Sequence, residues 1–432
     1  MDPGAESARV LGTVASRFAR FVVGAATSIV ISRALLPEGR GQYAVILGVV
    51  TISLSLGHLS LEQAHVFLWN KVGNRTTLIA NAFVLGLPLG GVSAIAAGLI
   101  VVSLGRDTFP IASYSLLVVG LAAVPLSTIV LYGNHFLILE RRTSRVNVVS
   151  ITSAVVSLAV FGVLALAGQL SVSAVVWVAT LSSLGQLILI VSALDVRVRA
   201  IDLRLASRAL TLGLRYHLGL AAFILLLKVD ILLLNTKVSS FQVGLYSLAV
   251  TLAELTFLLT DSVSQVVLPR QIDEELEKAA IFTARVVRTS LLVGAMFIGA
   301  ILVGSPVVIP TLYGQSFAGA IAPLIALAPG VLALSTIRPV SGFLVKLDKP
   351  LILSSANIGA TVLNVILNLA LIPPFGILGA ALASSISYML LAAFHIGWLI
   401  HAGAVTAGQL RPRWQDVTGP LAQGLRRVFR RA

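Results

Sequence analysis

Residues 223–235 read FILLLKVDILLLN, a run in which Lys228 and Asp230 interrupt otherwise apolar sequence. An ionised side chain at the centre of a membrane-spanning helix costs at least about 2.5–3.5 kcal/mol, so such residues are rare and usually functional. Apolar runs fill the chain: 57% of its 432 residues are hydrophobic, 11% are charged, and the mean hydropathy is +0.98. Soluble domains carry about 25% charged residues. The sequence therefore predicts a protein that crosses a membrane many times.

The apolar runs have the length of about 20 residues that a helix needs to cross the hydrocarbon core. Strands of a β-barrel would instead be about 10 residues of alternating polarity, and only helices and closed barrels span membranes. We therefore predict an all-α polytopic membrane protein with twelve transmembrane helices. The predicted spans are 9–34, 43–67, 77–103, 111–138, 146–168, 172–195, 212–236, 243–268, 285–311, 318–344, 350–372 and 376–401.

The Lys and Arg residues are distributed unevenly between the loops. Loops after even-numbered spans, counted together with the adjoining ends of the spans, contain 16 of them, and loops after odd-numbered spans, counted in the same way, contain 4. The positive-inside rule then places the even loops in the cytoplasm, and an even number of spans places both termini there too. Topology thus explains most of the net charge of +14, so we do not expect a nucleic-acid partner. The basic tail can also contact anionic lipid headgroups.

The two halves of the chain resemble each other. The sequence LSTI at 126–129 recurs at 334–337, and GQY at 41–43 corresponds to GLY at 244–246. Six spans per half give both halves the same orientation, so a pseudo-twofold axis along the membrane normal relates them, with the substrate site between two six-helix bundles. The predicted organisation is an N-terminal lobe at 1–196, a cytoplasmic linker at 197–211, a C-terminal lobe at 212–401 and a basic cytoplasmic tail at 402–432.

Four segments of the chain stand out: ISRALLPEGRGQYA (31–44), KVDILLLNTKVSSFQVGLYSLA (228–249), LYGQSFAGA (312–320) and NLALIPPFGILGAALASS (368–385). They resemble the polysaccharide-export flippases of O-antigen and capsule type, which belong to the multidrug/oligosaccharidyl-lipid/polysaccharide (MOP) exporter superfamily. The resemblance implies two bundles forming a V around a central cavity. A count of twelve spans favours this branch over the related lipid II flippases, which typically have fourteen.

The resemblance also implies a function. It is the translocation of undecaprenyl-diphosphate-linked oligosaccharides from the cytoplasmic to the outer leaflet of a bacterial plasma membrane, by alternating access, for cell-surface polysaccharide biosynthesis. The expected partners are this lipid-linked substrate, the membrane lipids and a polymerase or glycosyltransferase of the same pathway.

Basic residues within spans are candidates to bind the substrate pyrophosphate, because Lys and Arg form charge-assisted hydrogen bonds with phosphate oxygens. Arg17 and Arg20 share one face of span 1. Lys228 lies roughly 24 Å along span 7, just past the midplane, and Arg338 lies in span 10. The alternatives are that Arg17 and Arg20 only set topology and that Lys228 belongs to a structural ion pair.

Four acidic residues within spans are candidates for ion coupling or ion pairing. Asp230 points about 200° away from Lys228 around the helix, so the two side chains are not expected to share one cavity. An acidic residue can bind a coupling cation or proton, or pair with Arg17 or Arg20. The four candidates are Glu62, Asp230, Glu254 and Asp261.

His58, His65 and His217 are interpreted as interfacial or core histidines, and no spacing suggests a metal site. Tyr246 is interpreted as an anchor at the outer membrane interface. The chain has no cysteine and no Walker A motif, so we expect neither thiol chemistry nor ATP hydrolysis, and no cofactor.

Two other functions compete with the flippase. A cation-coupled multidrug or small-molecule antiporter of the same fold would need an acidic, aromatic cavity, whereas aromatic residues are 6% of the chain. A membrane-embedded glycosyltransferase or polymerase would need catalytic residues on large outer loops, and the predicted outer loops are short. We therefore expect a transporter and not an enzyme.

Overall fold

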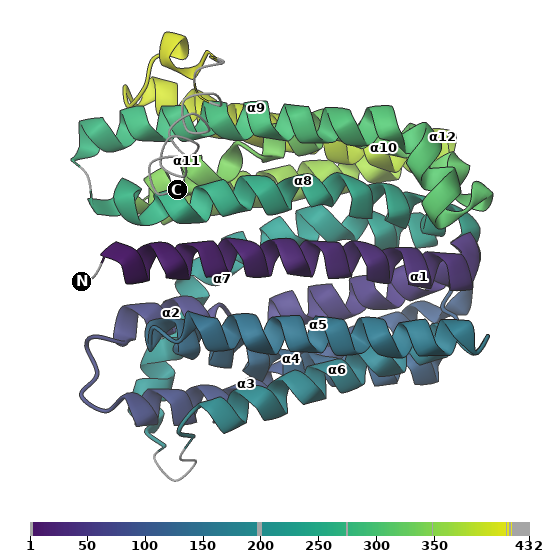
Figure 1. Ribbon diagram of the computed structural model, residues 1–432, viewed down its shortest axis with the longest axis horizontal. Coiled ribbons are helices and arrows are strands. Elements are labelled where there is room, and N and C mark those ends of the chain that lie inside the picture. The colour runs from purple at the N-terminus through teal and green to yellow at the C-terminus, as the bar shows by residue number, and fades with distance from the viewer. Residues whose placement is uncertain are drawn as a thin grey trace. The chain divides into compact units, whose positions relative to one another are not determined.

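The computed structural model describes residues 3–196, 201–273, 275–347, 349–411, 413 and 416, and their side chains except those of 3–17, 258–273, 345 and 350. Within these ranges every secondary-structure element is helical (Figure 1). Nine helices in this part of the chain are long and apolar enough to cross a membrane. The protein is therefore an all-α, multi-pass membrane protein.

The contacts divide the chain into two compact units. The first comprises Met1–Ser247 with Leu312–Phe317, and the second comprises Leu248–Thr311 with Ala318–Ala432. The division falls inside α8 (Ser240–Asp273), so the helix that carries Lys228 is grouped with the first unit. The lobe boundaries derived from the sequence remain a prediction.

In the first unit, neighbouring helices approach closely through small polar side chains. Helix α4 packs against α3 and α6, and α5 packs against α1 and α6. Ser127 of α4 donates to Ser183 of α6 at 3.2 Å, and the hydroxyls of Ser153 in α5 and Ser182 in α6 lie 2.7 Å apart. Small residues and hydroxyl pairs are the usual means of helix association in lipid. The helices are α1 (Pro3–Gly57), α2 (Leu61–Leu68), α3 (Arg75–Thr108), α4 (Tyr114–Leu139), α5 (Thr143–Leu166), α6 (Val172–Ala193) and α7 (Leu203–Asn235).

Helix α1 is broken where the sequence contains a leucine followed by proline. Leu36 has a φ of 58°, and Pro37 follows it. Proline lacks a backbone N–H and restricts the residue before it, so the helical ladder does not continue through this pair. The break lies between the predicted spans 9–34 and 43–67. The prediction of 43–67 as one continuous helix is wrong, since Leu59 and Ser60 also adopt positive φ and separate α1 from α2.

The repeated glycines of the two halves lie against each other. A Cβ on Gly41 would overlap the carbonyl of Ser240, and a Cβ on Gly244 would overlap the carbonyl of Pro37. Each glycine thus faces the carbonyl four residues before the other glycine. Only a residue without a side chain permits an approach this close between two helix backbones.

The start of α7 is fixed by side chains. The carboxylate of Asp202 accepts the backbone N–H groups of Arg204 at 2.9 Å and Leu205 at 3.1 Å, which is an N-cap. Asn81 of α3 holds the backbone of Asp202 through two hydrogen bonds, of 2.8 and 3.0 Å. Residues 203–211 of the predicted linker are therefore the first turns of a helix.

The second unit contains the rest of α8 and four further helices. Helix α12 bends at Gly376, whose φ is 56°, after Pro373 and Pro374. This bend lies between the last two predicted spans. Predicted span 318–344 is divided at Ser335 and Thr336, between α10 and α11. The four helices are α9 (Leu276–Val308), α10 (Ile321–Leu334), α11 (Ile337–Lys346) and α12 (Pro350–His401).

A buried ion pair attaches part of the C-terminal tail to α9. The guanidinium of Arg288 contacts both carboxylate oxygens of Asp416, at 2.7 and 2.9 Å, and also donates to the backbone carbonyl of Gln409. Gln409 belongs to a short 3₁₀ helix, η3 (Ala407–Leu410). Bidentate pairing of this kind fixes geometry as well as charge, so this stretch of the tail is docked rather than a plain basic extension.

Gly244→Ala is expected to destabilise the first unit, because the added methyl group overlaps the carbonyl of Pro37. Overpacking of a tight contact typically costs about 1–3 kcal/mol, so the midpoint of thermal unfolding in detergent should fall by several degrees. Gly162→Ala is the matched control, since Gly162 has open space around its Cβ position and alanine favours a helix. An equal midpoint for both variants would contradict the close contact.

Tail docking is expected to weaken at acid pH. The hydrogen bond from Arg288 holds the pKa of Asp416 below its usual range. Stabilisation by a carboxylate with a depressed pKa is present above its unfolded pKa, and it is lost as the pH falls through the lower folded value. A spin label on Ala407→Cys, in a chain that has no other cysteine, should become mobile over that acid range.

The same label should be mobile at neutral pH when Asp416→Asn is added. An immobile label in that double variant would show that the ion pair does not hold the tail.

Candidate functional site

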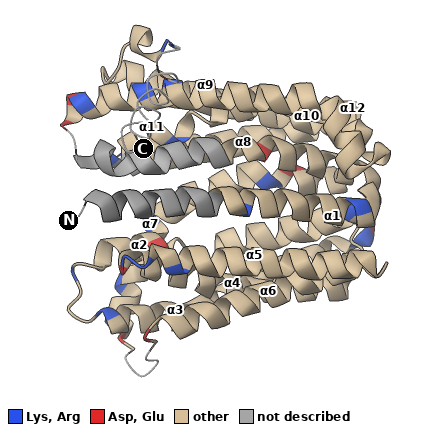
Figure 2. Ribbon diagram, viewed as in Figure 1, with Lys and Arg blue, Asp and Glu red and all other residues tan. Residues whose placement is uncertain are grey.

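The predicted basic residues lie in both units. Arg20 in α1 and Lys228 in α7 are both half-buried in the first unit, and these two helices pack against each other. Arg338 is exposed in α11 of the second unit. The side chain of Arg17 is outside the described residues. Most of the described charged residues lie near helix ends and in connecting segments (Figure 2). Few of them lie in helix interiors.

Asp230 is part of a buried contact between α7 and the start of α8. Its side chain is almost fully buried, and it accepts hydrogen bonds from the hydroxyl of Tyr246 and from the backbone N–H of Ile231 at 2.8 Å. Tyr246 is fully buried, so its interpretation as an anchor at the membrane interface is wrong. Its aromatic ring fills a helix contact and its hydroxyl satisfies a buried carboxylate.

The other acidic candidates belong to α2 and α8. Glu254 is half-buried in the part of α8 that belongs to the second unit. The side chain of Asp261 is outside the described residues. Glu62 lies in α2, in the first unit, and its ion pair in the structure is with His58 at 3.2 Å, a partner that the sequence did not suggest.

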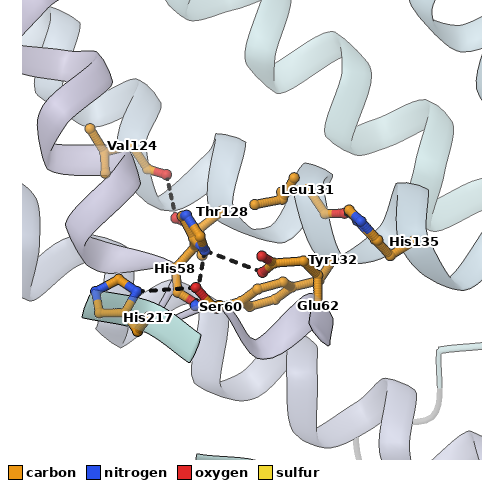
Figure 3. A network of polar contacts seen from close by, with 9 residues as sticks. All are labelled: His58, Ser60, Glu62, Val124, Thr128, Leu131, Tyr132, His135 and His217. Atoms are coloured by element: carbon orange, nitrogen blue, oxygen red, sulfur yellow. Dashed lines mark hydrogen bonds and ion pairs between the residues drawn. The ribbon is translucent and has the colours of Figure 1, made fainter. Parts of the chain in front are cut away.

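His58 and Glu62 belong to a polar network at the break between α1 and α2 (Figure 3). The Nδ1 atom of His58 lies 3.2 Å from Oε2 of Glu62 and accepts the backbone N–H of Ser60 at 3.0 Å. The Ser60 hydroxyl lies 3.2 Å from Nδ1 of His217 in α7. Tyr132 of α4 donates its hydroxyl to the His58 carbonyl at 2.6 Å. The network therefore joins the turn between α1 and α2 to three helices, α2, α4 and α7.

Local backbone geometry explains why the network forms here. Leu59 and Ser60 both have positive φ, which ends α1 and turns the chain into α2. Gly213 of α7 makes room for this turn, since a Cβ there would lie 2.6 Å from the Leu59 carbonyl. The helix break leaves backbone groups that need partners in a dry environment. The His58 ring and the Tyr132 hydroxyl supply two of them.

Further aromatic and imidazole rings surround the network. The rings of His58 and His217 meet edge to face at 5.7 Å, and the ring of His65 lies 5.4 Å from that of Tyr132. His135 follows Tyr132 on α4 and contacts the Leu131 carbonyl at 2.9 Å. The sequence predicted interfacial or core histidines at His58, His65 and His217. Spacing alone did not reveal that the fold gathers four of the six in the chain.

A second polar cluster lies beside the break at Leu36. Arg40 is buried, and its guanidinium donates to the hydroxyls of Ser247 at 3.1 Å, Ser28 at 3.2 Å and Ser32. Arg40 thereby ties the segment after the break both to the first part of α1 and to the start of α8. Arg40 directly precedes Gly41, so its hydrogen bonds help to hold the close contact between α1 and α8 at that glycine.

An apolar cavity of about 560 Å³ lies between the second part of α1 and α3, within the size range of small-molecule sites. Its walls include Val49, Leu56, Leu89, Ile100 and Leu232. The described residues that line it include no charged side chain. This cavity suits a hydrocarbon chain and not a pyrophosphate.

A metal centre finds no support in the described part of the chain. Within those residues, no group of three or more His, Cys, Asp or Glu side chains could hold a metal ion.

The fold is that of known transporters. An inward-facing multidrug resistance MATE family transporter of the MOP superfamily gives a TM-score of 0.69 at 16% identity, covering 89% of this chain and 94% of that one. The lipid II flippase MurJ in an inward closed conformation gives 0.70 at 14% identity, covering 93% and 88%. A MOP superfamily transporter from Pyrococcus furiosus gives 0.66 at 15% identity, covering 91% and 94%. The chain therefore has the same fold as these transporters.

Sequence comparison identifies the protein family of this chain. Residues 30–322 match the family described as polysaccharide biosynthesis protein, and the chain belongs to that family. It is also 29% identical over 202 residues to the probable low-salt glycan biosynthesis flippase Agl15 of Haloferax volcanii. That alignment covers 45% of this chain and 42% of the relative, so the chain spans less than half the length of the curated relative that it matches.

Tyr246→Phe is expected to destabilise the protein, because it removes a hydroxyl donor from the buried carboxylate of Asp230 and leaves the aromatic packing intact. A buried acceptor that loses a partner typically costs about 1–3 kcal/mol, and more when it is charged. The midpoint of thermal unfolding in detergent is the measurement. Tyr216→Phe, at a less buried tyrosine of the same unit, is the control, and equal midpoints would contradict the role of the hydroxyl.

Proposed function

We propose that this chain is a flippase that moves undecaprenyl-diphosphate-linked oligosaccharides from the cytoplasmic to the outer leaflet of a plasma membrane, for the synthesis of a cell-surface polysaccharide. Membership of the polysaccharide biosynthesis family supports this function, as do the flippase names of two similar proteins. The observation that carries it is Lys228, a half-buried cation in an otherwise apolar stretch of α7.

A lipid-linked oligosaccharide carries a pyrophosphate that cannot cross hydrocarbon without compensating charge. Cationic side chains along a water-filled path would form charge-assisted hydrogen bonds with its oxygens. Arg20 and Lys228 are proposed as these contacts, with Arg17 and Arg338 as further ones. Arginine provides a planar fork for phosphate, and lysine provides a compact point charge.

The transport cycle is proposed to be alternating access between two six-helix lobes. Twelve spans would give both lobes the same orientation, with the substrate path between them. The breaks at Leu36 and Gly376 separate the predicted spans at both ends of the chain and are compatible with this count. Both termini are proposed to be cytoplasmic, and a polymerase or glycosyltransferase of the same pathway is proposed to use the product.

A cation-coupled antiporter of multidrug type is the competing proposal, because the MATE transporters share the fold. The basic candidates Arg20 and Lys228 favour an anionic substrate over a cationic drug. Neither proposal assigns a covalent reaction to the chain, which is proposed to be a transporter without enzymatic activity.

Lys228→Ala is expected to reduce translocation of a fluorescent lipid-linked oligosaccharide in proteoliposomes by about tenfold or more, since hydrogen bonds to charged groups contribute roughly 1.5–3 kcal/mol. Lys228→Arg should retain most of the rate. Arg20→Ala should also reduce the translocation rate.

Lys237→Ala is the matched control, because Lys237 is exposed at the end of α7 and should not affect the rate. Normal translocation by both Lys228→Ala and Arg20→Ala, at equal protein content, would refute the proposed pyrophosphate contacts. Transport of cationic dyes, together with no movement of the glycolipid by the unmodified protein, would favour the antiporter.

A further inference from the structure

The apolar cavity between α1 and α3 is lined by one face of each helix. On α3 its wall runs from Pro88 to Leu104, which is about 24 Å of helix at 1.5 Å per residue. On α1 the wall runs from Val49 to Gly57, about 12 Å by the same rise. A volume of about 560 Å³ extended along these faces gives a long and narrow cavity, the shape of a chain rather than of a ring system.

Small side chains on α3 leave the space between the two helices. Ala96 and Ala97 lie in the middle of the α3 wall, and an alanine reaches no further than its Cβ. The helices touch near Gly57, where an added Cβ would lie 2.8 Å from the Cβ of Ser93. The cavity is therefore built into the packing of α1 on α3.

The two hydroxyl groups in the lining are bonded within the protein. Ser93 donates its hydroxyl to the Ser53 carbonyl at 2.6 Å, and the Ser53 hydroxyl lies 3.2 Å from that of Ser93, which can accept its hydrogen. The other described residues of the lining are glycine, proline and residues with hydrocarbon side chains. The cavity therefore offers a ligand an apolar surface.

Exposed apolar side chains border the cavity on one side. Val92 and Ile100 of α3 are 67% and 60% exposed, whereas Val49 and Val101 are buried. The cavity thus has a closed floor and an open apolar edge. A hydrocarbon chain can enter over this edge within apolar surroundings, whereas a charged group would lose its hydration there.

Leu232 of α7 connects this cavity to Lys228. Leu232 contributes to the cavity wall, and it follows Lys228 by four residues, so the two side chains share one face of α7, about 6 Å apart along the axis. Helix α1 packs against this face, since a Cβ on Gly48 would lie 3.1 Å from a methyl carbon of Leu232. A cation and the wall of an apolar cavity therefore lie one helical turn apart in the first unit.

This arrangement is complementary to a lipid with an anionic head. Bilayer hydrocarbon is as apolar as the cavity, so a chain alone gains little by entering it. A charge-assisted hydrogen bond from Lys228 to a phosphate oxygen supplies the attraction that keeps the chain there. We propose that the cavity binds the hydrocarbon chain of the transported polyprenyl diphosphate while Lys228 binds its diphosphate, an assignment that rests on the proposed function.

The size of the cavity fits part of such a chain. An apolar cavity of about 150 Å³ holds one benzene molecule, so this cavity has room for roughly 20 carbon atoms. The remainder of a longer polyprenyl chain stays in the bilayer.

Photolabelling of the purified protein in nanodiscs tests the chain site. The probe is geranylgeranyl diphosphate with a diazirine at the end of its chain, and mass spectrometry locates the adducts. They should fall on residues 88–104 of α3 and 49–57 of α1. Ala97→Phe fills the cavity from a half-buried position and should lose most of these adducts.

Ala159→Phe is the matched control, because Ala159 is an exposed alanine of α5 that does not line the cavity, and it should keep the adducts. Val92→Phe enlarges an exposed edge residue and should also lower labelling, which keeps the test decisive if Ala97→Phe does not fold. Adducts spread over α5 and α6, or adducts unchanged in both cavity variants, would overturn the chain site.

A second probe tests the position of the head. Geranylgeraniol with the same diazirine has no charge and should label the cavity much less than the diphosphate does. Lys228→Ala should lower labelling by the diphosphate to the level of the alcohol, and Lys237→Ala, at an exposed lysine of α7, should not. Labelling by the diphosphate that is unchanged in Lys228→Ala would contradict the proposed head position.

Competition separates the polyprenyl chain from bilayer lipid. Excess unlabelled geranylgeranyl diphosphate should abolish the adducts, and added phosphatidylglycerol should not. Equal competition by phosphatidylglycerol would assign the cavity to bilayer lipid and overturn the proposal. Labelling needs no transport, so intact labelling without translocation would contradict the flippase alone, and translocation without cavity labelling would contradict the chain site alone.

Discussion

Hydrocarbon offers no hydrogen bonds, and this constraint shapes every polar feature of the chain. Backbone groups must pair within helices, so each place where a helix breaks needs local partners. At Leu36 the break is accompanied by the buried guanidinium of Arg40 and its serine hydroxyls. At Leu59 and Ser60 the partners are His58 and Tyr132. These two buried polar clusters therefore lie where regular helix ends.

The same constraint explains why the two ionisable residues of α7, Asp230 and Lys228, lie in different surroundings. Asp230 has a tyrosine hydroxyl and a backbone amide as partners inside the first unit, and it is almost fully buried. Lys228, two residues earlier, is only half-buried. One helix thus presents a carboxylate that stabilises a packed contact and a cation on a different, more accessible part of its surface. The interruption in FILLLKVDILLLN thus places two ionisable side chains in two different environments.

The sequence was most informative where a single residue type dictates the backbone. Apolar runs predicted the helices, and the bounds of the predicted spans fall around Pro37 and Gly376, where the structure breaks α1 and α12. The break at Leu59 and Ser60 carries no glycine or proline, so its left-handed turn depends on contacts with Gly213 and Tyr132. The pairing of Arg288 with Asp416 joins residues 128 positions apart. The partner of Glu62 was missed because it follows from the turn, which periodicity did not reveal.

The reciprocal contact of Gly41 and Gly244 means that the segments around them form an interface of the kind found in a twofold homodimer, with each side presenting the same surface to the other. Both carbonyls involved belong to the backbone, so a larger residue at one position cannot be compensated by a smaller residue at the other. Each glycine receives the backbone of the other, so a side chain at either position would push the two segments apart.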